Sequence, residues 1–68
     1  MQKLVYDKTK NTVKLLNSDD GIIELFSDVV SVEPHGMCFV VKKIIGKDPR
    51  AAVVMMTPIN NTNFIIKR

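Results

Sequence analysis

Apolar residues on both sides of one polar loop constrain the fold of this chain most strongly. The segments MCFVVKKII and AAVVMMT flank the loop GKDPR within residues 37–57. Because side chains alternate between the two faces of a strand, each segment, as a strand, carries apolar residues on both faces. A single-layer sheet in a small domain buries one face only, so the second face needs another layer or another molecule. The hairpin therefore favours association.

The same alternation sorts the apolar side chains of this hairpin into two sets. Val40 and Ile44 share one face of the first strand, and Val54 and Met56 share one face of the second. We take these four residues as the candidate interface. Which of the two hairpin faces points outward is left open by the sequence.

The length of the chain limits how its fold can be stabilised. Its 68 residues are interpreted as one small β domain, residues 1–68, close to the size at which folding buries only about 60% of the unfolded surface. Domains of this size usually need a disulfide, a metal or oligomerisation. Cys38 is the single cysteine, which excludes an internal disulfide and a cysteine metal cluster. Oligomerisation is the expected support.

Turn residues divide the chain into short apolar segments. The expected strands cover residues 4–6, 12–16, 22–26, 29–33, 37–45, 51–57 and 64–66. Polar turns such as Asn17–Gly21 separate them, because their side chains bond to their own backbone and glycine accepts a positive φ. Six to seven short strands at this spacing predict an all-β meander, curled into a small barrel or an open sandwich.

Two segments also fit a helix. Apolar residues within 22–33 recur near helical spacing, and Asp48–Pro49 is typical of an N-cap before a short helix over residues 49–56. β-branched residues, such as Val53 and Val54 in the second segment, favour extended structure. Strand is the prediction for both segments, and helix is the alternative.

The residues from Glu33 to Gly36 predict a tight turn. Proline holds φ near the value needed at the second position of a type I turn, and this position falls to Pro34. Gly36 can then close the turn with a positive φ. We therefore expect the long hairpin to begin directly after Gly36.

The residues do not indicate an enzyme, a cofactor site or a metal site. Nucleophilic catalysis needs a base and an orienting group beside the nucleophile, and His35 is the only histidine. Cys38 lies in an apolar strand, where a thiol is expected to be unreactive. The acids between residues 19 and 28 lack the spacing of a calcium loop. We expect a non-enzymatic protein without cofactors.

Charged residues are segregated along the chain, whose net charge is +3. Residues 19–33 contain five acids and no lysine or arginine. Four cations surround the long hairpin and form the candidate basic patch: Lys42, Lys43, Lys47 and Arg50. Others lie near the two ends of the chain, at Lys3, Lys8, Lys10, Lys14, Lys67 and Arg68. The plain interpretation is a solvated surface whose edge lysines discourage uncontrolled strand pairing.

These features predict a protein-interaction module. We expect a homo-oligomeric accessory or regulatory protein that acts by binding a larger protein partner. The alternative is a small basic barrel that binds RNA or DNA. Such barrels usually stack bases on exposed aromatic side chains, and here Tyr6 is the one aromatic residue expected at the surface.

Hydropathy and cysteine content bear on the compartment. No apolar run approaches the roughly 18 residues of a membrane span, and the first residues lack the apolar core of a signal peptide. A lone cysteine agrees with a reducing compartment. The expectation is a cytoplasmic protein without membrane contact.

Overall fold

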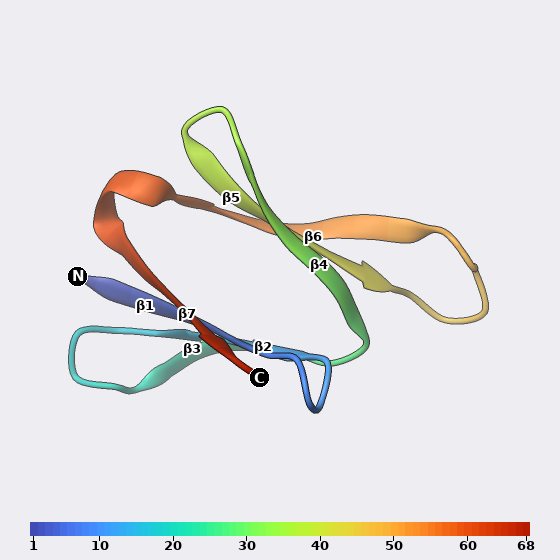
Figure 1. The fold of residues 1–68 in the computed structure, drawn as a ribbon, viewed down its shortest axis with the longest axis horizontal. Coiled ribbons are helices and arrows are strands. Elements are labelled where there is room, and N and C mark those ends of the chain that lie inside the picture. Colours follow the sequence, from blue (N-terminus) through green and yellow to red (C-terminus); the bar gives the residue numbers. More distant parts are fainter.

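The computed structural model describes residues 1–68 as seven strands in two sheets (Figure 1). Sheet A has the order β3-β2-β1-β7, with β1 at Gln2–Asp7, β2 at Thr12–Leu16, β3 at Ile22–Phe26 and β7 at Thr62–Lys67. Sheet B has the order β4-β5-β6, with β4 at Val29–His35, β5 at Cys38–Ile44 and β6 at Ala51–Pro58. A 3₁₀ turn at Ile59–Asn61 joins β6 to β7. The all-β prediction is confirmed, as an open sandwich.

Strand is also confirmed for the two segments with a helical alternative. Residues 22–33 belong to β3 and β4, which are separated by Ser27 and Asp28. The φ of 56° at Asp28 interrupts the extended chain there. Most of residues 49–56 lies in β6, which pairs with β5 along its length. Tertiary pairing thus agrees with the β-branched content of both segments.

The last strand departs from a simple meander. β7 pairs in parallel with β1, with Phe64 opposite Leu4, rather than with the preceding β6. The chain crosses from sheet B to sheet A at the 3₁₀ turn. There the buried hydroxyl oxygens of Thr57 and Thr62 lie 3.2 Å apart and share a hydrogen bond. As a result, the first and last strands of the chain are neighbours.

The core lies between the two sheets. Six buried side chains form its centre: Leu4, Tyr6, Val13, Leu15, Val29 and Val41. Phe39 and Phe64 pack against this centre from opposite sheets, with ring centroids 5.0 Å apart. Tyr6 is 7% exposed, so the expectation of a surface tyrosine is wrong. Alternation along β1 directs Tyr6 to the same inward face as Leu4.

The turn between β4 and β5 is shorter than predicted. His35 pairs with Cys38, which leaves a two-residue turn, and Pro34 lies inside β4. Placing Pro34 at the second turn position was therefore wrong. Gly36 has the predicted positive φ, at 62°. A proline is tolerated in β4 because this strand is at the edge of sheet B.

Three of the four edge strands have an irregular register. In each of these strands, one residue at the irregularity has no partner on the neighbouring strand. The extra residues are Ile23 in β3, Val30 in β4 and Val54 in β6. Such an extra residue shifts the faces of the residues beyond it. The pairing of β7 with β1 has no shift.

Candidate functional site

The outer face of sheet B combines apolar and charged side chains. The strand register places them in two rows across β4, β5 and β6, namely Glu33–Val40–Met56 and Ser31–Lys42–Val53. Residues opposite one another on neighbouring strands project to the same face, so these rows form one surface. We call it the sheet B face.

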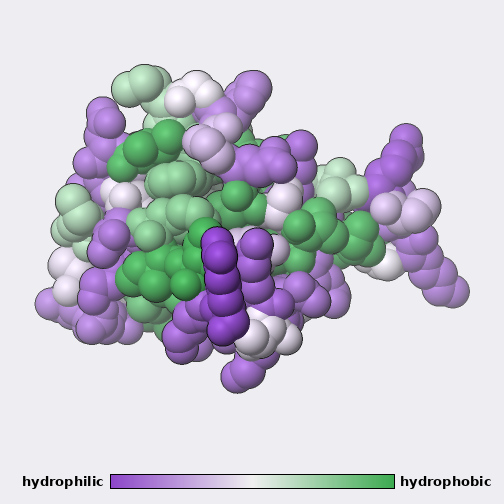
Figure 2. Space-filling view, in the orientation of Figure 1, coloured by the Kyte–Doolittle hydropathy of each residue, from purple (hydrophilic) through white to green (hydrophobic).

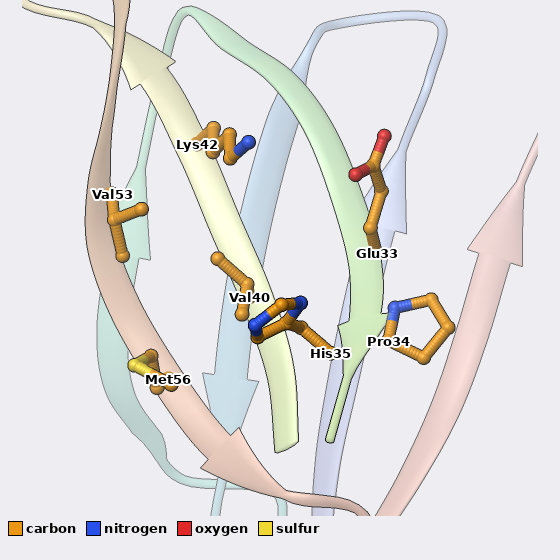
Figure 3. Close-up of a pocket in the computed structure, with 7 residues that line it drawn as sticks. All are labelled: Glu33, Pro34, His35, Val40, Lys42, Val53 and Met56. Carbon is orange, nitrogen blue, oxygen red and sulfur yellow. The ribbon is translucent and has the colours of Figure 1, made fainter. Parts of the chain in front are cut away.

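A shallow depression of about 280 Å³ lies on the sheet B face (Figure 3). Val40 is only 7% exposed and forms its floor, whereas Val53 and Met56 are 53% and 56% exposed. Figure 3 shows Lys42 and Glu33 toward one end of the depression and Met56 toward the other. Because pockets for whole small molecules are usually about 300–1,000 Å³, this depression suits a side chain of a binding partner better.

The structure places three of the four candidate interface residues on the sheet B face. Val40 and Met56 line the depression, and Ile44 lies further along β5, opposite Ala51. Val54, however, is the extra residue of β6 and packs against the core. Its expected position on this face was wrong, because simple alternation fails at a bulge. Val53 lies on the face instead.

The candidate basic patch does not form one surface. Lys42 lies on the sheet B face, and alternation along β5 directs Lys43 to the opposite face. Lys47 and Arg50 belong to the loop between β5 and β6, where the Arg50 Nε lies 3.4 Å from an Asp48 carboxylate oxygen. Hydrogen bonds from the Arg50 backbone amide and guanidinium lower the pKa of Asp48. The loop therefore pairs part of its own charge.

Tertiary structure instead gathers a different set of cations at one end of sheet A. Parallel pairing places Lys67 opposite Asp7, and the Lys8 amide donates to the Lys67 carbonyl at 2.8 Å. Five exposed residues make up this cationic end: Lys8, Lys10, Lys14, Lys67 and Arg68. Their five positive charges and the one negative charge of Asp7 give +4, whereas the whole chain carries +3. The other five bases and six acids sum to −1.

Asp7 remains ionised within this cationic end. The Thr9 hydroxyl donates a hydrogen bond to the Asp7 carboxylate and is the largest influence lowering its pKa. The Thr9 backbone amide donates to the same oxygen at 3.0 Å. Asp7 therefore offsets one of the five positive charges of this set.

The sequence shows the basic segments around Lys8 and Lys67 but does not show that they lie close together. Lys8 and Lys67 lie near opposite ends of the chain, and a parallel strand pair has no hairpin turn that would mark it. The available signal was the presence of lysines beside both the first and the last predicted strand. Only the pairing of β1 with β7 brings these lysines together on one surface.

The histidine and the cysteine of the chain are neighbours. His35 and Cys38 lie opposite each other beside the β4–β5 turn. No group of three or more histidine, cysteine, aspartate or glutamate side chains is placed to hold a metal ion. Every buried side-chain nitrogen and oxygen has a hydrogen-bond partner.

Comparisons with known proteins give no match. No family model, no curated protein and no solved structure matches this chain. The structure contains no helix with the length and apolar character needed to span a membrane. What the protein binds is therefore inferred from the sheet B face and the cationic end.

Proposed function

We propose that the protein is a non-enzymatic interaction module that forms homo-oligomers through the sheet B face. The observation that carries this proposal is the depression whose apolar walls, Val53 and Met56, remain more than half exposed. Eleven large hydrophobic side chains are exposed in this chain, against seven hydrophobic residues in the core. Covering apolar surface contributes about 25 cal/mol per Å², so a partner on this face would add what the small core lacks.

The charges on the sheet B face suit a second copy of the chain. Glu33, Lys42 and His35 line the depression, and with the histidine counted as neutral the formal charges of Glu33 and Lys42 cancel. A two-fold axis through the depression would place Glu33 of each copy near Lys42 of the other. Two-fold interfaces use the same patch twice and must be self-complementary, which this pairing of opposite charges satisfies.

Beyond self-association, the proposed role is that of an accessory or regulatory protein bound to a larger protein. The lone cysteine, Cys38, is free and half-buried. This agrees with a reducing compartment and supports our proposal of a cytoplasmic protein.

Nucleic-acid binding is the rival function, and the aromatic side chains count against it. Tyr6 is buried, while Phe26, Phe39 and Phe64 pack against the core. Proteins that bind single strands gain about 1–3 kcal/mol per base from stacking on exposed aromatic rings. The surface of this protein has cations but no such platform, which favours the protein-interaction role.

Sedimentation equilibrium tests the proposed self-association. At micromolar concentrations the natural sequence should give a mass above the 7.7 kDa of one chain. Met56→Asp should return this mass to that of a monomer, because it places a charge at the apolar wall. Ile22→Asp changes a residue of similar exposure on β3 of sheet A and should leave the oligomer intact. Circular dichroism verifies that both variants fold.

Two results would contradict the proposal. One is a monomeric natural sequence throughout the micromolar range. The other is equal dissociation in Met56→Asp and Ile22→Asp, which would show that the sheet B face has no special part in the contact.

A further inference from the structure

β7 has the one regular free edge in the sandwich. The other edge strands, β3, β4 and β6, each contain an extra residue, and β4 and β6 also contain prolines, Pro34 and Pro58. Bulges and prolines are two devices by which proteins prevent unwanted strand pairing. β7 contains neither and pairs with β1 along Thr62–Lys67 without a shift. Its outer edge is therefore suited to accept another strand.

The unpaired backbone groups of β7 can be assigned from one hydrogen bond. The Lys67 carbonyl accepts from the Lys8 amide, so the backbone groups of Lys67 point toward β1. Successive residues of a strand direct their N–H and C=O groups to alternate sides. Ile65 therefore also faces β1, whereas Phe64 and Ile66 present their backbone groups at the free edge.

A groove of about 240 Å³ runs beside this edge. Residues of both sheets line it: Tyr6, Lys8 and Ile66 from the sheet A side, and Val30, Ser31, Val32 and Glu33 from β4. Ile66 and Val30 are 40% and 48% exposed. No ladder of hydrogen bonds joins β7 to β4, so the sandwich is open here. Apolar side chains of an added strand could occupy this opening.

The groove lining has one base and one acid, Lys8 and Glu33, so the preference for an acidic occupant comes from the cationic end beside the groove. Lys8 lines the groove and belongs to the cationic end, which carries +4. Ile65 is partly exposed on the outer face of sheet A, beside Val5 of β1. Figure 2 shows hydrophobic and hydrophilic surface side by side over the visible side of the molecule. A partner that matches both features carries carboxylates and apolar side chains in one extended segment.

We propose that β7 is the docking edge for an extended acidic segment of a partner protein, which adds to sheet A as a fifth strand. Alternate apolar residues of this segment enter the groove beside Ile66, and its carboxylates contact the cationic end. The inference rests on the proposed interaction role and names the class of partner. It does not require self-association, because β7 lies outside the sheet B face, although Ser31 and Glu33 of that face also line the groove.

Hydrogen exchange on the full chain tests the docking edge directly. The probe is a synthetic peptide that alternates valine with glutamate, and the control peptide has lysine in place of glutamate. On binding the acidic peptide at low salt, the amides of Phe64 and Ile66 should exchange several-fold more slowly. The amide of Ile65 serves as an internal control, because its bond to β1 already protects it.

Matched charge reversals test the cationic end by fluorescence anisotropy with the labelled peptide. Lys8→Glu with Lys67→Glu should weaken binding about tenfold or more, since opposite charges at the contact become like charges. Lys47→Glu with Arg50→Glu makes the same change in net charge within the β5–β6 loop, which does not line the groove, and should leave the affinity nearly unchanged. Ile66→Pro removes a donor at the free edge and should abolish binding. The hydrogen-exchange measurement uses the natural sequence, so it still tests the docking edge if the Ile66→Pro variant does not fold.

Several results would overturn the proposal. These are no peptide binding at low salt, unchanged exchange at Phe64 and Ile66 on binding, or equal weakening by both pairs of charge reversals. An oligonucleotide that binds more tightly than the acidic peptide, and loses binding in the Lys8 and Lys67 variant, would assign the cationic end to phosphate. Protection of the same amides on raising protein concentration alone would show that a second copy occupies the edge. The outcomes that concern the peptide or an oligonucleotide leave the Met56→Asp test of the sheet B face unchanged.

Discussion

The two sheets of this protein share one core but present different surfaces to solvent. The sheet B face contains an apolar depression, whose lining has two formally charged residues, Glu33 and Lys42. One end of sheet A carries five exposed cations and one acid, and lies beside a regular free strand edge. Charge placement, rather than strand architecture, separates the two surfaces. A neutral face can meet its own copy, whereas a face of net +4 would repel one.

The two surfaces also differ in how the chain builds them. The sheet B face comes from strands that follow one another, β4 to β6, joined by short connections. The cationic end needs the first and the last strand side by side. Contacts between distant segments depend on the fold as a whole, so the cationic end should be the more sensitive surface to any loss of core packing.

The largest effect should come from the core that both surfaces share. Leu4 is fully buried, and Leu4→Ala should cost about 2–5 kcal/mol through lost burial and the cavity left behind. A domain of this length has a total stability of roughly 3–10 kcal/mol, so much of the protein would unfold. Val5→Ala on the outer side of β1 is the control and should cost far less. Urea denaturation followed by circular dichroism measures both, and equal costs would contradict the assigned faces.

A smaller effect is expected at the turn that leads into the sheet B face. Gly36 has a φ of 62°, and an added Cβ meets no atom within 4 Å. Gly36→Val should therefore destabilise through backbone strain alone, by about 1–2 kcal/mol. This corresponds to a fall in melting temperature of about 4–8 °C per kcal/mol for a domain of this size. Gly36→Asn should cost less, because asparagine tolerates positive φ, and equal losses would point to a cause other than φ.

Raising the salt concentration should have a still smaller effect on binding, and this effect should differ between the two surfaces. Exposed charges are screened over about 8 Å at 0.15 M ionic strength, so acidic-peptide binding at the cationic end should weaken as salt rises. Self-association through the sheet B face should change little, because it is driven by apolar burial. Sedimentation and peptide anisotropy at low and moderate salt measure the two. An equal salt dependence would remove the distinction between a neutral and a cationic surface.

The smallest effect concerns Asp7, the single acid of the cationic end. Its pKa is lowered chiefly by the Thr9 hydroxyl, so this hydrogen bonding stabilises the fold while the carboxylate is ionised, above its unfolded pKa. The contribution is lost as pH falls through the folded pKa. Thr9→Ala should raise the pKa of Asp7 toward its usual value, and Thr9→Ser should keep it low. An NMR titration that finds the same pKa in both variants would contradict this assignment.

The sequence by itself determined the local structure. Residues 12–16 and 22–26 form strands with the predicted bounds, because alternation of β-branched and apolar side chains and the turn residues between them act over a few positions. The same local chemistry predicted a positive φ at Gly36. It also indicated that the long hairpin would need a second layer, which sheet A now supplies on one side.

Tertiary structure decided which residues reach each surface. The extra residue in β6 turned Val54 toward the core and left Val53 outside, since a bulge depends on how two strands pair rather than on either alone. Tyr6 was buried for a related reason, because the face of β1 that points inward is set by its packing against sheet B. The parallel pairing of β1 with β7 then joined lysines from both ends of the chain into one cationic end. Strand pairing over such separations is selected by the shared core, which no short segment of the sequence encodes.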